Sequence, residues 1–74
     1  MDNKLIILIN VLQGKLGMPE ISSIESLILE YIKRYSNEDE IGTVLLQEYI
    51  SLLNEGMSIE GSNEHIDKLL EYFI

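Results

Sequence analysis

Apolar residues recur along the chain at the three- and four-residue spacing of an α-helix, and four stretches of this kind follow one another. The clearest covers 23–35, where Glu30 lies on the face opposite the apolar stripe and within one helical turn of Lys33 and Arg34. The stripe itself consists of Ile24, Leu27, Ile28, Tyr31, Ile32 and Tyr35. The spacing therefore predicts an amphipathic helix with a solvated polar face.

An earlier stretch, 4–16, predicts a helix that is apolar on more than one face. Its main stripe consists of Leu5, Leu8, Ile9, Leu12 and Leu16. Ile6, Ile7 and Val11 widen this stripe, and such widening is typical of a helix at the centre of a fold or at an interface. We therefore expect either a central helix or a homodimer seam formed by Ile6, Ile7 and Val11.

Helix breakers and a capping pair separate these two stretches. Gly14 and Gly17 are stop signals for the first helix, and Pro19 interrupts the chain after it. Ser22 stands three residues before Glu25, the spacing of a capping box, so the second helix is expected to start near residue 23.

The third predicted helix covers 38–55. Ser36 with Asp39, or Asn37 with Glu40, supplies its N-terminal cap, and Gly56 ends it. The residues expected to face inward are Ile41, Val44, Leu45, Tyr49, Leu52 and Leu53, with Leu46 and Ile50 at the edges of the stripe.

A fourth helix is predicted over 63–74, capped by Ser62 or Asn63. The preceding loop, 57–61, is expected to pack Met57 and Ile59 against the core. The apolar face of this last helix consists of Ile66, Leu69, Leu70 and Phe73.

These elements predict one all-α domain over 1–74, a compact array of four short helices at about 4–16, 23–35, 38–55 and 63–74. The connections are short, which favours antiparallel neighbours. The chain has 74 residues and no cysteine, so its core must form without disulfide bonds.

Charge divides the chain into two unequal halves. Residues 1–37 carry four acids and four bases, whereas 38–74 carry nine acids and one base, Lys68, and the formal net charge is −8. Such a field repels nucleic acid and anionic membranes and attracts basic protein surfaces. A plainer interpretation is that the charge keeps an apolar protein soluble.

No group of residues predicts catalysis, a metal site or a cofactor. His65 is the sole histidine, and the chain offers no cysteine or second histidine with which it could form a catalytic or metal site. We therefore expect His65 to be a surface residue. Glu38, Asp39 and Glu40 suit the start of a helix, where adjacent side chains diverge instead of converging on an ion. We therefore expect a protein that is not an enzyme.

The chain is also expected to be cytoplasmic. The longest uninterrupted apolar run, 5–9, is far shorter than the roughly 18 residues of a membrane-spanning helix. The first residues have neither the basic start nor the small-residue cleavage site of a secretory signal.

One part of the chain, about 40–74, resembles a known family. The residues that carry the resemblance are Glu40-Ile41, Leu52-Leu53-Asn54-Glu55-Gly56, Met57-Ser58-Ile59, and Ile66, Leu69 and Leu70. Their pattern is similar to that of the small helical immunity proteins of the Maf type and of contact-dependent inhibition. The chain departs from that pattern at Gly42, where such proteins tend to carry a bulky residue. The resemblance implies a protein that binds and neutralises a bacterial toxin, often a nuclease.

An acidic protein of this kind suits a basic protein partner, such as a toxin or an enzyme that binds nucleic acid. Two alternatives use the same features: a phage-encoded inhibitor of the anti-defence or anti-CRISPR type that mimics phosphate charge, and a homodimeric regulatory helical module. The acids expected to contact a partner are Glu38, Asp39, Glu40, Glu48, Glu55, Glu60 and Glu64.

Overall fold

A computed structural model describes residues 3–18, 20, 23–56 and 63–74, and this part of the chain forms four α-helices without a strand. The helices are α1 (Asn3–Leu16), α2 (Ile24–Tyr35), α3 (Glu40–Asn54) and α4 (Asn63–Phe73). The prediction of a compact all-α array of four helices is confirmed, and each boundary lies within two residues of its predicted place.

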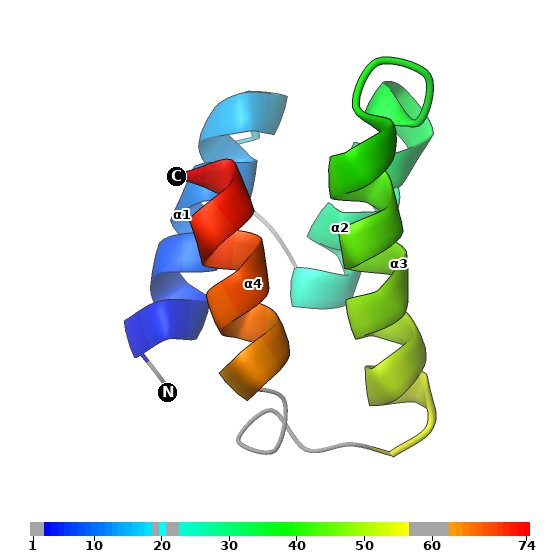
Figure 1. Ribbon diagram of the computed structural model, residues 1–74. Helices are drawn as coiled ribbons and strands as arrows, with labels where there is room; N and C mark the ends of the chain where they lie inside the picture. Colours follow the sequence, from blue (N-terminus) through cyan, green and yellow to red (C-terminus); the bar gives the residue numbers. More distant parts are fainter. Residues whose placement is uncertain (1–2, 19, 21–22, 57–62) are drawn as a thin grey trace.

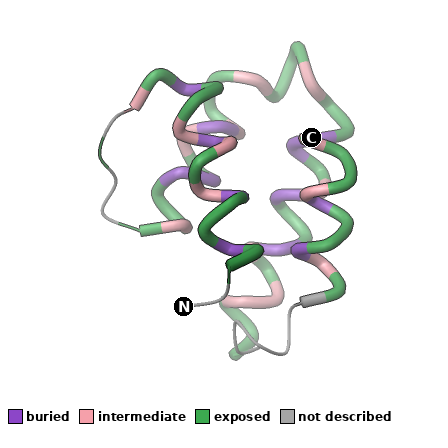
Figure 2. Tube along the Cα trace, turned by 90° about the vertical axis from the view of Figure 1, so that its left-hand side faces the viewer, coloured by how far each residue is buried: buried purple, intermediate pink, exposed green. Residues whose placement is uncertain are grey.

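The four helices pack in a ring around one core. Figure 1 shows α1 beside α4, with α2 and α3 forming the other half, and each helix packs on the next along the chain while α1 closes the ring on α4. The buried positions of each helix turn toward the space that the four helices enclose (Figure 2). The molecule measures 29 × 23 × 22 Å.

α1, α2 and α4 run in the same direction, and α3 runs against them (Figure 1). Contacts at matching ends support this: Arg34 Nη1, late in α2, donates to the carbonyl of Leu16 at 2.8 Å, and Lys4 pairs with Asp67 at 2.8 Å near the starts of α1 and α4. The expectation of antiparallel neighbours is therefore wrong for α1 and α2. Seven residues, 17–23, join these helices. When extended they can span about 23 Å, more than the roughly 18 Å length of a twelve-residue helix.

α1 is not a central helix, so that expectation is wrong as well. It packs on α2 and α4, as every helix of the ring packs on two neighbours. Its interior stripe consists of leucines, whereas Ile6 and Ile7 are 39% and 44% exposed and Val11 is half-buried. The buried residues of α1 are Leu5, Leu8, Leu12 and Leu16.

α3 is rotated from its predicted orientation. Ile41 and Val44, expected to face inward, are 65% and 45% exposed, whereas Leu46, expected at the edge of the stripe, is fully buried. The other three buried residues of α3 are Gly42, Thr43 and Tyr49. Apolar residues surround most of this helix, so the apolar pattern alone leaves its rotation open.

The remaining core residues come from α2 and α4. The buried ones are Leu27, Ile28 and Tyr31 of α2 and Ile66 and Leu69 of α4. Half-buried side chains that include Ile24, Tyr35 and Phe73 pack around them. The predicted apolar faces of 23–35 and 63–74 are confirmed by this packing.

The observed N-terminal caps differ from the predicted ones. Ser23 caps α2, because its Oγ accepts the backbone N–H of Ser26 at 3.1 Å, and Ser22 lies outside the described residues. Asp39 caps α3, while Ser36 and Asn37 lie in the turn before it. The capping box predicted from either of these two residues is therefore wrong.

Two of the three glycines that were predicted to end a helix do so. Gly17 and Gly56 follow the ends of α1 and α3 with φ of 65° and 95°, a backbone region that favours glycine. Gly14 lies inside α1 and does not end it. The expected cap Ser62 and the expected packing of Met57 and Ile59 fall outside the described residues.

Candidate protein-interaction site

Most of the acids predicted to meet a partner lie on the surface of the described structure. Glu38, Glu40, Glu48, Glu55 and Glu64 are all exposed, and Glu60 lies outside the described residues. These five acids come from the turn before α3, from α3, from the turn after it and from the first turn of α4. Much of the negative charge of residues 38–74 therefore lies at the surface, on the α3 and α4 side of the ring.

Asp39 differs from the other predicted acids because it is half-buried and bonded within the chain. Its Oδ2 accepts the hydroxyl of Tyr31 at 2.6 Å, and its Oδ1 accepts the backbone N–H of Gly42 at 2.9 Å and the hydroxyl of Tyr72. Asp39, Tyr31, Gly42 and Tyr72 together form what we call the Asp39 anchor. It ties α2, α3 and α4 to one carboxylate, so Asp39 is not the free surface acid that was expected.

Electrostatics in the Asp39 anchor favour the ionised carboxylate. Partial burial acts to raise the pKa of Asp39, but hydrogen bonds from Tyr31, Tyr72 and Gly42, with the nearby charge of Lys15, outweigh it and lower that pKa. Burial, followed by the hydrogen bond to Asp39, raises the pKa of Tyr31 well above its ordinary value. The hydrogen bond to Asp39 also raises the pKa of Tyr72.

Gly42 is the glycine at which the chain departs from the immunity-protein pattern, and the anchor explains its small size. A Cβ built at this position would lie 2.2 Å from Asp39 Oδ2 and 2.8 Å from Asp39 Cγ. Any larger residue would therefore displace the carboxylate from its three hydrogen bonds. A bulky side chain here is incompatible with the cap that this chain uses.

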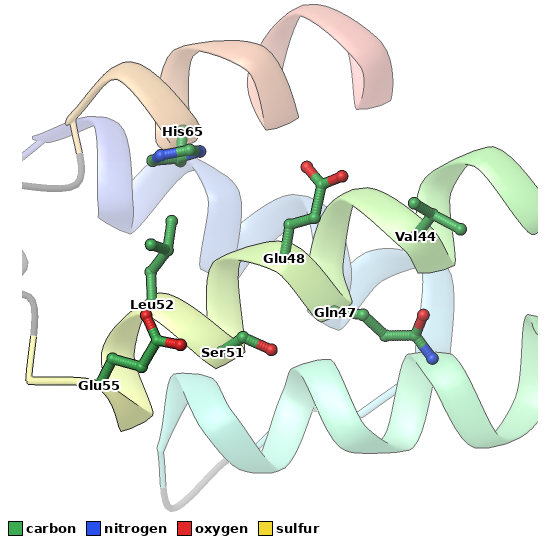
Figure 3. A pocket seen from close by; sticks show the side chains of 7 residues that line it. All are labelled: Val44, Gln47, Glu48, Ser51, Leu52, Glu55 and His65. Atoms are coloured by element: carbon green, nitrogen blue, oxygen red, sulfur yellow. The ribbon is translucent and has the colours of Figure 1, made fainter.

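A groove of about 440 Å³ runs along α3 where that helix faces the start of α4. We call it the α3/α4 groove, and its lining residues are Val44, Gln47, Glu48, Ser51, Leu52, Glu55 and His65. Figure 3 shows His65 of α4 facing Leu52 of α3, with Glu55 near Leu52 and Val44 toward the other end. The groove thus joins apolar side chains to two carboxylates on one surface.

The structure brings together only part of the predicted set of acids. Glu48 and Glu55 line the α3/α4 groove, whereas Glu38, Glu40 and Glu64 are not among its lining residues. Sequence reasoning missed Val44 and Leu52 as groove residues, because both were assigned to the interior. It also missed His65, which is half-buried in the wall of the groove.

Among the described residues, neither groove acid forms an ion pair with a lysine or an arginine. In the described part of the chain Lys4 pairs with Asp67 and Arg34 pairs with Glu30, both at 2.8 Å, and neither Glu48 nor Glu55 takes part in these pairs. No Lys or Arg is among the lining residues. The surface therefore offers hydrogen-bond acceptors and negative charge beside exposed apolar area, which suits a basic and apolar ligand.

The described residues give little support for a metal site or for a membrane-spanning helix. No group of three or more histidine, cysteine, aspartate or glutamate side chains is arranged there to hold a metal ion. None of the described helices is both long enough and apolar enough to cross a membrane. The features that remain are the acids, the groove and the Asp39 anchor.

The fold and the groove define a small acidic all-α protein with a groove between the outer side of α3 and the start of α4. Comparison with family models, curated proteins and solved structures finds no match. The resemblance to immunity proteins over 40–74 therefore stays a prediction.

Proposed function

We propose that this chain is a cytoplasmic binding protein that neutralises a basic protein partner, as an immunity protein does when it blocks a bacterial toxin such as a nuclease. The observation that carries the proposal is the group of exposed acids on α3, on α4 and in the turns next to α3, which the single base of that half, Lys68, leaves largely uncompensated. The anchored, compact ring supports it, because a rigid scaffold loses little conformational entropy when it binds.

Charge complementarity explains how such a protein would act. A nuclease needs a basic surface to hold phosphates, and an acidic protein that covers this surface denies it to the nucleic acid. Opposite fields also draw the two proteins together faster than diffusion between neutral surfaces would allow. No catalytic step is required of the chain, because occupying the surface is enough.

Affinity capture from the cell that produces this protein tests the proposal. The wild-type chain serves as bait, and a Glu48→Lys/Glu55→Lys variant is the control, since both positions are exposed and the substitutions leave the core unchanged. We expect mass spectrometry to identify one basic nuclease or toxin that the wild-type bait retains and the reversed bait loses. Capture of no basic protein by the wild-type bait would contradict the proposal.

The same experiment separates the phage alternative from immunity. A CRISPR or restriction subunit among the captured proteins would favour a phage-encoded inhibitor, because such an inhibitor acts on enzymes that handle nucleic acid. A toxin domain with a nuclease fold would favour immunity. Both outcomes keep the chain in the class of acidic binding proteins.

A homodimeric regulatory module is the second candidate, and the exposure of Ile6 and Ile7 on α1 favours it. These side chains, with half-buried Val11, would form the seam between two copies. Sedimentation should then show two chains for the wild-type protein and one chain for Ile7→Glu. A wild-type monomer at high concentration would remove this candidate.

A further inference from the structure

We propose that the α3/α4 groove is the docking site of the basic partner and that it takes one amphipathic helix, apolar on one side and basic at its edges. This rests on the function proposed above and adds where the partner sits and which element of the partner is bound. Four observations lead to it: the exposed apolar side chains of α3, the two groove acids, the helical walls, and the length of the groove.

Apolar side chains follow the outer side of α3 along its length. Ile41 and Val44 are exposed and three residues apart, so they are neighbours on the helix surface. Leu52, two turns beyond Val44, is half-buried in the floor of the groove opposite His65 (Figure 3). An exposed apolar stripe of this kind costs free energy in water, and a partner that covers it relieves that cost.

The groove acids decide against a second copy of this chain as the occupant. Glu48 and Glu55 both line the groove and both are exposed. A symmetric pair of copies joined through this surface would bring four carboxylates together, and like charges placed side by side disfavour association. A partner helix that carries lysine or arginine gains at the same two positions.

A helix suits this groove better than an extended peptide. Strand addition needs a row of free backbone groups along a sheet edge, whereas the walls here are two helices, which leave backbone groups unbonded only in their end turns. An extended peptide would therefore lose water from its own backbone without new partners. A helix enters with its backbone groups already bonded, so side chains alone make the contact.

The spacing along α3 defines the pattern of the bound helix. Val44 and Glu55 are eleven residues apart, which is about 16 Å or three helical turns, and Glu48 and Glu55 are separated by about 10 Å. A helix packed along α3 would therefore carry two basic residues seven positions apart. An apolar residue between them would contact Leu52, and another, three or four positions beyond the basic residue that meets Glu48, would contact Val44.

A titration with a defined probe tests this assignment. The probe is a 14-residue peptide with lysines seven positions apart and leucines on the same helical face, and the control peptide has the same composition in an order that breaks the face. The amide spectrum of the ¹⁵N-labelled chain is followed. We expect the patterned peptide to shift amides of 44–55 and of His65, and to bind at least about tenfold more tightly than the scrambled peptide.

Two matched protein variants complete the test. Glu48→Gln/Glu55→Gln removes two charges from the groove and should weaken the patterned peptide roughly fivefold to tenfold. Glu25→Gln/Glu71→Gln removes two exposed charges that do not line the groove, and binding should stay within about twofold of wild type. Circular dichroism confirms that each variant folds.

Several outcomes would overturn the assignment. These are absence of binding by the patterned peptide, equal binding of both peptides, shifts spread over all acidic segments, or equal weakening by both double variants. Amide shifts in the groove that grow with protein concentration without peptide would make the occupant a second copy. If wild type and Glu48→Gln/Glu55→Gln capture the same basic protein equally well from the producing cell, the groove assignment fails and the proposed function stands. If neither captures a basic protein, the proposed function fails.

Discussion

The carboxylate of Asp39 receives hydrogen bonds from three helices: from the Tyr31 hydroxyl of α2, the Gly42 N–H of α3 and the Tyr72 hydroxyl of α4. A group with this many partners, half-buried and charged, is stabilising only while all of them stay in place. Its neighbours Glu38 and Glu40 are exposed, and none of the hydrogen bonds of the anchor involves their side chains. Asp39 therefore has a structural role, whereas the adjacent acids Glu38 and Glu40 are exposed to solvent.

Replacing Asp39 should cost much more stability than replacing Glu38. Asp39→Ala removes a helix cap and two tyrosine hydrogen bonds to a charged acceptor, so we expect a loss of about 2–3 kcal/mol in the free energy of unfolding. Glu38→Ala, one residue away in the exposed turn, should change it by less than about 0.5 kcal/mol. Urea unfolding followed by circular dichroism measures both. Equal losses would show that the anchor does not stabilise the fold.

The effect of Gly42→Ala should change sign with the residue at 39. In the wild type the new Cβ meets the Asp39 carboxylate, and we expect a loss of about 1–2 kcal/mol. With Asp39→Ala already in place the clash is gone, and alanine should stabilise the helix by up to about 1 kcal/mol relative to glycine. A double-mutant cycle measures this coupling. Additive effects would mean that Asp39 does not restrict residue 42.

The pKa shifts of the anchor predict loss of stability at both ends of the pH range. The pKa of Asp39 is lowered from 3.8 by folding, so its contribution is present above that value and is lost as pH falls through the folded pKa. The pKa of Tyr31 is raised from 10.0, so its contribution is present below that value and is lost as pH rises beyond it. Unfolding measured from pH 2 to 11 should show both slopes. Asp39→Asn should reduce the acid slope, and Tyr31→Phe should reduce the alkaline slope, of which Tyr72 supplies a further part. Slopes unchanged by these substitutions would contradict the assignment.

At the scale of the elements, the sequence was sufficient to predict where the helices lie and insufficient to orient them. Helical spacing and the glycines at 17 and 56 placed all four helices to within two residues. The rotation of α3 could not be predicted, because its apolar residues occupy more than one face and Asp39 bonds to tyrosines that are 8 and 33 positions away. The groove was missed for the same reason, since Val44 and Leu52 were assigned to the core.

Neighbouring apolar residues of α3 provide a direct test of this rotation. Leu46 is fully buried, so Leu46→Ala should cost about 2–4 kcal/mol through lost burial and a cavity. Val44, two positions earlier, is exposed, and Val44→Ala should change the free energy of unfolding by less than about 0.5 kcal/mol. Thermal or urea unfolding of the two variants measures both changes in the free energy of unfolding. A larger loss at Val44 would restore the orientation expected from the apolar pattern.

At the scale of the whole molecule, the acidic half of the chain exposes most of its acids on α3, on α4 and in the turns next to α3. The acids of α3 and the first turn of α4 are exposed there, whereas bases of the other half are engaged locally, as Arg34 is with Glu30 and with the carbonyl of Leu16. The excess of acids in the second half of the chain could be predicted from the sequence, because it follows from counting the charged residues. The groove beside that charge depends on how two helices meet, so it required the structure.

The central claim is that this side of the molecule meets a basic partner through electrostatic attraction. The most direct test is the association rate constant for the captured partner, measured by stopped flow over increasing sodium chloride concentration. Electrostatic steering predicts a rate that falls by about tenfold or more between 20 and 500 mM salt, because added ions screen exposed charges. Glu48→Gln/Glu55→Gln should associate several-fold more slowly at low salt and match wild type at high salt, while Glu25→Gln/Glu71→Gln stays closer to wild type. An association rate that is independent of salt, or equal for wild type and the groove variant at low salt, would contradict the account.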